Sequence, residues 1–584
     1  MKYVLVSGGV ISGVGKGIIA SSTGLLLKTR GLKVTMIKID PYMNIDAGTM
    51  APTEHGECFV LDDGGETDLD LGNYERYLNI TLSRDHNITT GKIYQHVIDR
   101  ERRGDYLGKT VQIVPHLTDA LQEWFMRVAR LHVDETKAQP DVCVIELGGT
   151  VGDIENAPFV EALRQLRRKA GAGNFLHIHV SMIPVINEEQ KTKPTQQTIK
   201  DVRSAGLNPD LIACRCKDRL MASTIDKVAM FCQVETEQVV AVHDVPSTYH
   251  VPMVLEKQGL ITSLTKILNL DKLEIPSKLK LRGATTWEMW KSSTSVQHHS
   301  QIVTIALVGK YTSFADSYIS VIKALEHSAM FCRRKLNLVM VDSSHLEEDD
   351  GNTSSIESQK AWEILRKADG ILVPGGFGTR GTEGMIVATR YARINKVPFL
   401  GVCLGMQIAV IEYARTICKI PGASSKEFDD QAIDPVIIFM PEVDSKSMGA
   451  TMRLGMRPTH FQPGTGWSQM RGMYRNSPVA ASRDTSDGLV IHERHRHRFE
   501  VNPAYVPKLA SNGLNFVGKD DQGERMEVLE LKDHPWFVGV QFHPEYLTKV
   551  LEPSRPYLGF FAASAGCLKE VMEKLQSDKG VVEN

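Results

Sequence analysis

The sequence predicts an α/β protein of two domains, each with a largely parallel β-sheet. Short apolar runs alternate with helix-like segments along both halves of the 584-residue chain, as buried parallel strands and crossover helices do. One glycine-rich turn follows the apolar run 3–6 and another follows the run 370–373, as expected at the ends of such strands. The predicted strands are 3–6, 34–39, 142–145, 176–182, 211–214, 239–243, 303–308, 370–373, 397–402 and 536–542.

Composition divides the chain further. Residues 269–300 lose the strand pattern and gather Lys, Ser, Thr and two His, so we predict a linker there. It separates a first domain, 1–268, from a second, 301–575, and the polar residues 576–584 are expected to form a disordered tail. We find no internal repeat of fixed period.

The overall composition is typical of a large enzyme, with 42% hydrophobic residues, 24% charged residues and a formal net charge of −2. No stretch approaches the roughly 20 apolar residues that cross a bilayer, and Met1 leads directly into a predicted strand. Nine cysteines lack the paired spacing of a disulfide framework or zinc site. We therefore expect a cytoplasmic protein with reduced thiols, bound neither to membranes nor to nucleic acid.

Cys403 lies between Gly401 and Gly405, where the predicted strand 397–402 meets a predicted helix, 406–415. This is the layout of a nucleophile elbow, and the helix N-terminus helps to stabilise a thiolate. His543 and Glu545, one residue apart, would face the same way on an extended segment. His543 can then take the thiol proton while Glu545 orients the ring.

A glycine turn, 374–378, follows the predicted strand 370–373 and can direct backbone N–H groups at a developing oxyanion. Elbow, glycine turn and His-x-Glu together resemble a class I glutamine amidotransferase domain, from about residue 302 to the end. The resemblance implies that Cys403 attacks the glutamine amide, forms a glutamyl thioester and releases ammonia. It also implies an oxyanion and glutamine site that contains Gly376, Gln407, Glu427 and Arg498.

The N-terminal strand leads into a glycine loop, 8–17, and a helix-like segment, 18–30. Strand, glycine loop, lysine and helix form a phosphate cradle. Gly17 stands where a phosphate loop normally has the Ser or Thr that binds magnesium. Magnesium would therefore be held mainly by carboxylates, and we predict Asp70 and Glu146 as its ligands.

Motifs along nearly the whole chain resemble the CTP synthase family, of the eukaryotic, glutamine-hydrolysing type. They are 8–17, 38–42, 64–74, 104–108, 146–155 and 191–196. The resemblance implies a phosphate-loop-like, dethiobiotin-synthetase-like amidoligase domain before the amidotransferase domain. It implies ATP-dependent amination of UTP at C4 through a 4-phosphorylated intermediate, the final step of de novo CTP synthesis.

The family's site residues carry over by position. The resemblance implies that ATP is bound by Gly13, Val14, Gly15, Lys16, Gly17, Lys38 and Asp70. The resemblance implies that UTP or the inhibitor CTP is bound by Ser12, Glu155, Lys191, Lys193, Gln196 and Lys227. It also implies that an ammonia tunnel is lined by His55 and Cys58. Lys191 and Lys193 would point to one side of an extended segment and meet a triphosphate. The resemblance further implies Mg²⁺, activation by GTP, feedback inhibition by CTP, and a homotetramer that assembles into filaments.

Two local features need separate interpretation. The basic run 493–498 is dense enough to suggest nucleic acid, but it is short and contains Arg498, so we assign it to the amidotransferase pattern. Gly449 and Ala450 stand where the family usually has two glycines, which leaves that loop's geometry open.

Two alternatives from other functional classes remain. A glutaminase with a regulatory nucleotide-binding domain would hydrolyse glutamine without aminating a nucleotide. A non-catalytic, filament-forming homologue would retain the fold for assembly alone. A chain that keeps Cys403, His543, Glu545, Lys16, Asp70 and Glu146 favours the coupled synthetase over both.

Overall fold

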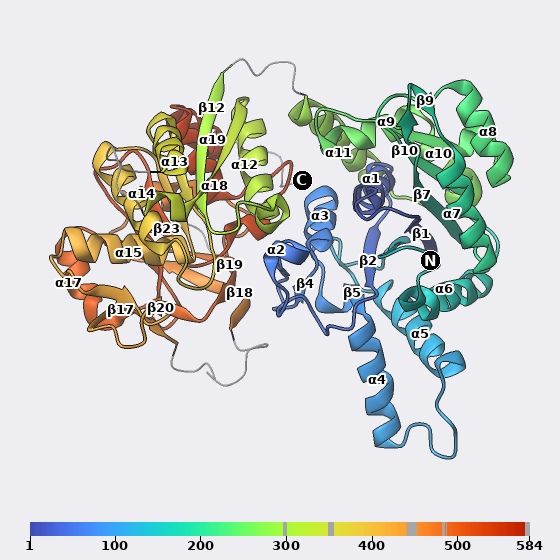
Figure 1. The fold of residues 1–584 in the computed structure, drawn as a ribbon, viewed down its shortest axis with the longest axis horizontal. Coiled ribbons are helices and arrows are strands. Elements are labelled where there is room, and N and C mark those ends of the chain that lie inside the picture. Colours follow the sequence, from blue (N-terminus) through green and yellow to red (C-terminus); the bar gives the residue numbers. More distant parts are fainter. Residues whose placement is uncertain (296–300, 348–354, 441–451, 482–484, 486–487, 578–584) are drawn as a thin grey trace. The chain divides into compact units, whose positions relative to one another are not determined.

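The computed structural model describes the chain except residues 296–300, 348–354, 441–451, 482–484, 486–487 and 578–584. It consists of two compact units (Figure 1). The first contains Met1–Ala47 and Asp70–Thr294, and the second contains Gly48–Leu69 and Ser295–Asn584. A short piece of the N-terminal half therefore belongs to the second unit, and each unit has its own sheet.

The first unit has a seven-stranded sheet in which every neighbouring pair is parallel. Its central strands are buried on both faces, which explains why they read as continuous apolar runs. In spatial order the strands are β11 (Val239–Val242), β10 (Leu211–Arg215), β7 (Phe175–Met182), β1 (Lys2–Gly8), β6 (Val142–Leu147), β2 (Val34–Asp40) and β5 (Asn87–Thr89).

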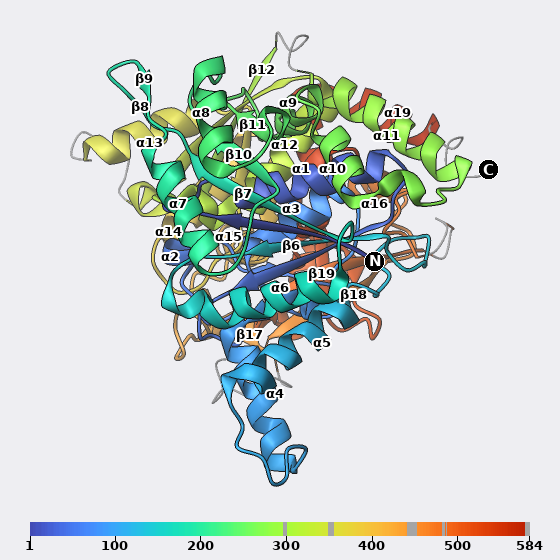
Figure 2. The ribbon, with the colours of Figure 1, turned by 90° about the vertical axis from the view of Figure 1, so that its right-hand side faces the viewer.

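Helices cover both faces of this sheet (Figure 2). Tyr3 and Leu5 of β1 face the core shared with α4 (Thr90–Arg103), α5 (Thr118–Val128) and α6 (Ala157–Ala170). The opposite face carries α1 (Lys16–Thr29). The unit's other helices are α3 (Leu69–Leu78), α7 (Lys193–Ser204), α8 (Ala222–Cys232), α9 (Val251–Lys257), α10 (Leu260–Leu268) and α11 (Ser277–Thr294), with a small hairpin of β8 (Val185–Ile186) and β9 (Glu189–Gln190).

The interval predicted as a linker, 269–300, contains α11 in the structure. Trp290 of this helix is buried, and its indole N–H donates to the Tyr249 carbonyl at 3.0 Å. Trp287 is also buried. The helix is therefore packed as part of the first unit, and residues 296–300 lie outside the described part of the chain.

The second unit has a nine-stranded sheet. Its first five strands are parallel, and the others join by antiparallel pairs, so the predicted parallel arrangement holds for one half of this sheet. In spatial order they are β13 (Lys335–Asp342), β12 (Ile302–Gly309), β14 (Gly370–Val373), β15 (Phe399–Val402), β23 (Phe537–Val540), β22 (Met526–Glu530), β21 (Asn515–Lys519), β18 (Arg453–Phe461) and β19 (Leu489–His497). The α/β fold class predicted from the sequence is confirmed.

Two hydrophobic cores lie on the two faces of this sheet, and β12 alternates between them as a period of two requires. Ile305 and Leu307 face one core, and Ala306 and Val308 face the other. The first core is closed by α12 (Ile319–Cys332), α16 (Gln469–Tyr474), α18 (Arg555–Ser564) and α19 (Leu568–Ser577). The second is closed by α13 (Ile356–Lys367), α14 (Thr382–Asn395), α15 (Leu404–Thr416) and α17 (Val506–Ser511).

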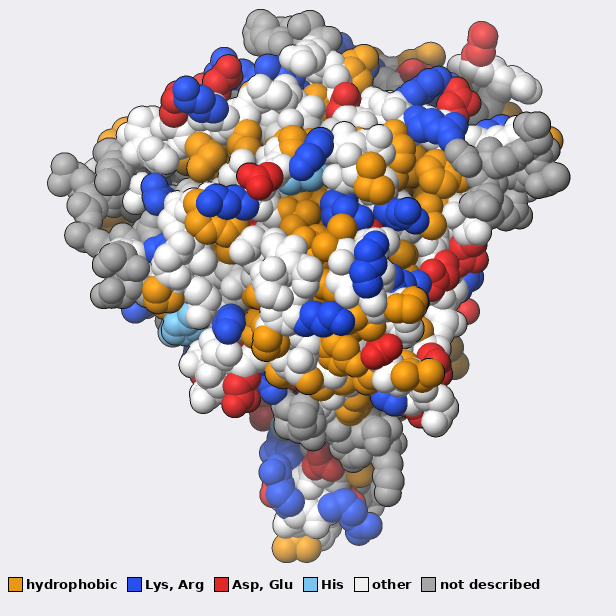
Figure 3. Space-filling model, turned by 90° about the vertical axis from the view of Figure 1, so that its left-hand side faces the viewer, with side chains coloured by type: hydrophobic (Ala, Val, Ile, Leu, Met, Phe, Trp, Pro, Cys, Tyr) orange, Lys and Arg blue, Asp and Glu red, His pale blue; other side chains and the backbone are white. Residues whose placement is uncertain are grey.

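Smaller elements complete the second unit. One three-stranded sheet contains β16 (Ala423–Ser425), β17 (Asp434–Phe439) and β20 (Phe499–Val501). The piece from the N-terminal half, which we call the 48–69 segment, contains α2 (Pro52–His55), β3 (Phe59–Val60) and β4 (Glu66–Thr67). Of the predicted tail 576–584, Gln576 and Ser577 end α19, and the rest lies outside the described residues. On the face drawn in Figure 3, Lys and Arg side chains lie among hydrophobic and acidic ones.

Candidate functional site

Cys403 stands at the junction that the sequence predicted, directly after β15 and before α15. Its backbone has φ 52° and ψ −102°, a positive φ that is uncommon for a residue with a side chain. The Cys403 N–H donates to the Val540 carbonyl at 2.7 Å, which ties the turn to β23. A strained residue held by its surroundings is typical of a functional site.

The two glycines beside Cys403 serve close packing rather than a left-handed turn, because neither has a positive φ. A β-carbon on Gly401 would lie 2.6 Å from the carbonyl carbon of Gly405. A β-carbon on Gly405 would collide with the carbonyl oxygen of Val373 in β14. Because both positions lack a side chain, α15 can begin in close contact with β15 and β14.

His543 and Glu545 form a pair, with Nδ1 of the histidine 2.8 Å from Oε1 of the carboxylate. The expectation of an extended segment is wrong: Pro544–Leu547 is a 3-10 turn, which begins at Pro544 and brings Glu545 back to the ring. Tyr557 donates its hydroxyl to Glu545 Oε2 at 3.3 Å. Burial lowers the pKa of His543, but the Glu545 carboxylate and the Cys403 sulfur outweigh it and raise this pKa to about 10.

Gly375, on the glycine turn after β14, lies next to both Cys403 and His543. A β-carbon at this position would lie 2.8 Å from Cε1 of His543 and 3.6 Å from Cβ of Cys403. Gly375, Gly376, Cys403, His543 and Glu545 line one cavity. The cysteine, the histidine–glutamate pair and the predicted oxyanion turn therefore converge on a shared space.

The residues predicted to hold glutamine lie around this turn. Glu427 accepts a hydrogen bond from the Gly378 N–H at 2.9 Å. Burial raises the pKa of Glu427, while the charges of Lys310 and Arg498 oppose the rise, which places both cations near it. Gln407 is buried and donates to the Phe499 carbonyl at 3.0 Å, so its amide supports the floor of the site.

Lys310 was not predicted. It directly follows β12 and donates to the carbonyls of Phe377 and Gly378, which fixes the glycine turn. Burial lowers its pKa to about 8, and Glu427 opposes that change. A lysine at the carboxyl end of a predicted parallel strand was the signal available in the sequence.

In the first unit, the glycine loop joins β1 to α1 as predicted. Gly13 and Gly15 have φ values of 75° and 99°, and a β-carbon on either would meet no atom within 4 Å. Both glycines therefore border open space, where a phosphate could approach the backbone. Lys16 donates its ammonium to the Gly149 carbonyl at 2.9 Å, and burial lowers its pKa.

Lys38 lies among carboxylates at the carboxyl ends of β2 and β6. Its Nζ is 3.4 Å from Asp40 and 3.5 Å from Glu146, and it also pairs with Asp70. Tyr74 donates to the other oxygen of Glu146. Burial, and then the charge of Asp70, raise the pKa of Glu146 to about 7.

Gly17 has a specific reason to lack a side chain. A β-carbon there would collide with Asp70 Oδ1 and would lie 3.6 Å from Glu146 Oε2. The carboxylates of Asp70 and Glu146 thus occupy the side of the loop where a phosphate loop normally has its hydroxyl. Hard oxygen donors beside a phosphate cradle fit a magnesium ion.

A cavity beside this loop contains functional candidates that sequence reasoning missed. Val14 and Gly15 of the loop line it together with Arg215, His243 and Asp244. The last three follow or end β10 and β11, at the same sheet edge as the loop. Their place at the carboxyl ends of predicted parallel strands was the signal that could have identified them.

Comparison with known proteins matches the two halves of the chain to two family models. A family model described as the CTP synthase N-terminus matches residues 2–270, and one described as class-I glutamine amidotransferase matches 313–562. The CTP synthase of Schizosaccharomyces pombe is 60% identical over 98% of this chain and 94% of its own length. The CTP synthase of Neurospora crassa is 60% identical over 99% of this chain and 98% of its own length.

The chain belongs to the CTP synthase family. A solved structure described as the Trypanosoma brucei CTPS glutaminase domain with bound acivicin is 36% identical, with a TM-score of 0.40. The matched region covers 45% of this chain and 94% of the solved chain. Among the described helices, none combines the length and apolar character that a membrane crossing requires.

The positions predicted for UTP in this CTP synthase family member gather partly around α7 and the glycine loop. Lys193 opens α7, Gln196 lies one turn on, and Thr198 packs against Gly9 of the loop. Lys191 precedes the helix, so the two lysines do not share an extended segment as expected. Lys191 pairs with Glu189, and Lys227 of α8 also acts on that carboxylate. Ser12 lies on the loop, and Glu155 in a 3-10 turn after β6; both are exposed.

The two tunnel candidates differ in position. Cys58 is buried and lines the cavity that contains Cys403. His55 ends α2 and is exposed, and it is not among the described residues that line this cavity.

The basic run 493–498 forms the end of β19 and the residue that follows it. Arg494 is only 1% exposed and lies 2.6 Å from Asp62. Arg496 lies 2.8 Å from Glu66. These arginines are thus committed to ion pairs inside the second unit. Gly449 and Ala450 lie outside the described residues.

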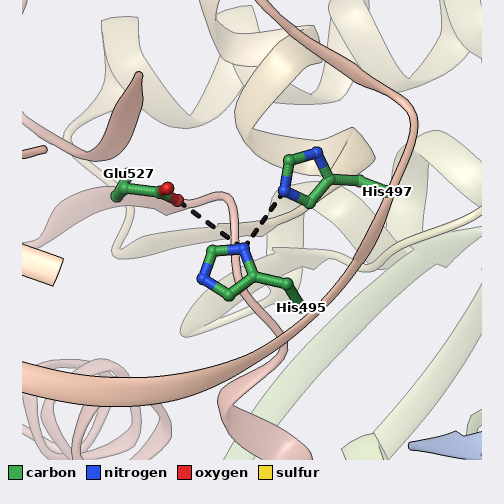
Figure 4. A group of neighbouring side chains, drawn as sticks. All are labelled: His495, His497 and Glu527. Carbon is green, nitrogen blue, oxygen red and sulfur yellow. Dashed lines mark hydrogen bonds and ion pairs between the residues drawn. The ribbon is translucent and has the colours of Figure 1, made fainter. Parts of the chain in front are cut away.

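His495 of the same run lies between Glu527 of β22 and His497, with its Nδ1 atom 3.7 Å from Glu527 Oε2 and 3.1 Å from His497 Nε2 (Figure 4). All three are buried, and the ligand atoms lie within 4.8 Å of one another, a spacing that a metal ion could bridge. Glu527 already has a cationic partner, however, since Arg453 Nη2 lies 3.2 Å from its Oε1. Burial lowers the pKa of His497 to about 3 and raises that of Glu527 to about 8. We assign this group as a buried polar cluster that supports β19, not as the predicted magnesium site.

Proposed function

We propose that this chain converts UTP to CTP, using ATP and ammonia released from glutamine. The observation that carries the proposal is the presence, in one chain of the CTP synthase family, of two complementary sites. One is the buried Cys403–His543–Glu545 group beside a glycine turn. The other is a phosphate loop flanked by Lys16 and Lys38 and by the carboxylates of Asp70 and Glu146.

In the amidotransferase half, His543, whose pKa is raised to about 10, would already hold the proton taken from the Cys403 thiol when the sulfur attacks the glutamine amide carbon. Glu545 stabilises the imidazolium that results. The Gly376 N–H donates to the oxyanion of the tetrahedral intermediate, which has room because no side-chain atom lies closer than 3.6 Å to a β-carbon there. His543 then protonates the leaving nitrogen, ammonia departs, and water hydrolyses the thioester to glutamate.

Recognition of glutamine uses the charges around the glycine turn. Glu427 would bind the α-ammonium, and Arg498 would bind the α-carboxylate. Burial raises the pKa of Glu427, and the charges of Lys310 and Arg498 act against that rise and so favour its ionised form. Gln407 would keep the floor of the pocket in place through its bond to the Phe499 carbonyl.

In the amidoligase half, ATP phosphorylates O4 of UTP, and ammonia displaces that phosphate to leave the amino group of CTP. Residues 13–17 would cradle the ATP phosphates, with Lys16 and Lys38 opposing their charge. Asp70 and Glu146 would hold magnesium, which supplies positive charge to the phosphate oxygens when bound. The cavity lined by Val14, Arg215 and His243 would receive the base of ATP.

UTP and CTP are assigned to the loop and the helices beside it. Lys191, Lys193, Gln196 and Lys227 would meet the UTP triphosphate, with Ser12 near the pyrimidine. Glu155 would contact the ribose of CTP when CTP inhibits the enzyme. Ammonia would leave the cysteine site past Cys58, which lines the same cavity, and His55 would act further along the passage.

The family resemblance supports several further properties of the protein. They are activation by GTP, feedback inhibition by CTP, a homotetramer that assembles into filaments, and a cytoplasmic location. A role as the final step of de novo pyrimidine nucleotide synthesis belongs with them.

The test is to incubate the purified protein with UTP, ATP, Mg²⁺ and GTP, with glutamine or ammonium chloride in parallel, and to follow CTP by chromatography. CTP from both nitrogen sources is expected. CTP from ammonia alone would point to an inactive amidotransferase or passage. Glutamate without CTP would favour the glutaminase alternative, and no product at all would favour the scaffold.

A further inference from the structure

The 48–69 segment is bound to the second unit by polar contacts along its length. Glu57 accepts hydrogen bonds from the N–H and the hydroxyl of Ser320 at the start of α12. Asp62 pairs with Arg494, whose guanidinium also donates to the Val60 carbonyl at 3.0 Å. A segment from the N-terminal half therefore lies in a defined place beside β19.

Tyr546 joins this segment to His543. Its hydroxyl donates to the Cys58 carbonyl at 3.1 Å, and its ring meets Phe59 edge-on, with centroids 5.2 Å apart. The Tyr546 ring also stacks on the His543 ring, with centroids 5.2 Å apart and planes at 20° to each other. One buried side chain thus contacts both the segment and the catalytic candidate.

Stacking and the glutamate bond constrain different motions of His543. The bond from Nδ1 to Glu545 holds one edge of the ring but permits rotation about that bond. The Tyr546 face sets the plane of the ring, and so the direction of Nε2, which must face the Cys403 sulfur. A tyrosine face also favours a protonated imidazole over it.

The same segment reaches Cys403 by a second route. Arg496 pairs with Glu66 at 2.8 Å through its side chain, and its carbonyl lies 3.9 Å from the Cys403 sulfur. The segment ends at Leu69, and the next residue is Asp70, the predicted magnesium ligand of the first unit. Chain continuity thus connects the phosphate site to both members of the cysteine–histidine pair.

We propose that Tyr546 is a positioning residue that makes the orientation of His543 depend on the docked 48–69 segment. Through it, ATP and UTP bound in the amidoligase half promote glutamine hydrolysis. The inference rests on the proposed function and adds a residue outside the triad to it. Loss of the Tyr546 hydroxyl bond to the Cys58 carbonyl would make glutamine hydrolysis insensitive to bound nucleotides. Loss of the Tyr546 ring would also impair proton transfer by His543.

Two substitutions separate these effects. Tyr546→Phe keeps the stacked ring and removes the hydroxyl bond to Cys58, whereas Tyr546→Leu removes both. Tyr413→Phe is the matched control, because Tyr413 also donates to a backbone carbonyl, that of Asn512 at 2.6 Å, away from the cavity residues. Full-length proteins would be compared for kcat and KM of glutamine hydrolysis with and without ATP plus UTP, for its pH profile, and for CTP formation from ammonium chloride.

We expect Tyr546→Phe to lose most of the nucleotide stimulation of glutamine hydrolysis, about tenfold in kcat, with KM and the pH profile retained. Tyr546→Leu should in addition shift the pH profile, and CTP formation from ammonia should persist in both variants and in the control. Nucleotide stimulation equal to that of the unmodified protein in Tyr546→Phe, or an unchanged pH profile in Tyr546→Leu, would overturn the inference alone. No glutamine hydrolysis by the unmodified protein would instead overturn the proposed function and this inference with it.

Discussion

The Nδ1 atom of His543 and the Oε1 atom of Glu545 lie 2.8 Å apart, both in buried side chains, across a 3-10 turn that begins at the proline between them. This turn lets a carboxylate two residues away hold the imidazole without a partner from another element. It also leaves the opposite edge of the ring for Cys403.

The pair predicts a specific pH dependence of stability. The pKa of His543 rises from 6.5 to about 10 on folding, so the pair stabilises the fold fully below pH 6.5 and loses this contribution as the pH rises towards 10. Glu545→Gln should therefore lower the free energy of unfolding by about 3 kcal/mol near pH 6, and by less as the pH approaches that pKa. Denaturant titrations at several pH values measure the difference.

Glu552→Gln is the control, because Glu552 is 36% exposed and 3.7 Å from Arg555. Such a partly exposed pair contributes about 0–1 kcal/mol, so this variant should track the unmodified protein across the range. A constant difference between Glu545→Gln and the unmodified protein would contradict the assigned pKa.

Cys403→Ala should abolish glutamine-dependent CTP formation, by about 10⁴-fold or more, because the covalent intermediate can no longer form. Ammonia-dependent CTP formation should remain, since it does not use the thiol. Cys418→Ala removes another buried cysteine, which lies after α15 and contacts the Lys508 carbonyl, and should keep both activities. Glutamine use by Cys403→Ala would remove this residue from its proposed role.

Gly405→Ala should destabilise the second unit. Its β-carbon would collide with the Val373 carbonyl, which β14 holds in a parallel ladder, so the strain cannot be relieved by a rotamer change. A cost of about 1–3 kcal/mol or more is expected from such overpacking, read out as a lower denaturation midpoint. Gly466→Ala adds a methyl group where no atom lies within 4 Å and should be close to neutral. Equal stability of the two variants would contradict the close packing at the elbow.

Asp70→Asn and Glu146→Gln should weaken the stabilisation of the protein by Mg²⁺ and ATP. At a ligand concentration 100 times Kd, binding stabilises the folded state by about 2.7 kcal/mol, which thermal unfolding detects. Chelation of magnesium should reduce the same shift in the unmodified protein. Asp119→Asn, an exposed carboxylate of α5, should behave like the unmodified protein. A full thermal shift in both site variants would exclude these carboxylates as the metal ligands.

Local pattern predicted most of the regular structure near the sites. Predicted strands 34–39 and 370–373 are β2 and β14, and the predicted helix 406–415 lies within α15. These elements are buried on a face or on both faces, so their apolar residues recur with the period of the element itself. The predicted linker, by contrast, contains α11, whose weak periodicity hides two buried tryptophans.

Contacts between residues far apart in the chain were harder to predict from the sequence. Lys38 was predicted as a phosphate ligand, yet its burial among Asp40, Asp70 and Glu146 depends on three segments meeting at one sheet edge. Lys310 and Tyr546 act through backbone carbonyls, which carry no signature in a sequence. Their partners are set by where the glycine turn and the 48–69 segment come to lie.

The sequence by itself determined the α/β class, the strands that end at Cys403 and at the glycine loop, and the residue types of both sites, because these depend on hydrophobic periodicity and short motifs. Only the tertiary structure decided that the 48–69 segment packs with the second unit, that a 3-10 turn joins His543 to Glu545, and that Gly17 makes room for Asp70. The physical reason is that burial and ion pairing reward contacts between residues far apart in the chain, and a local pattern records that a side chain is buried but not what it is buried against.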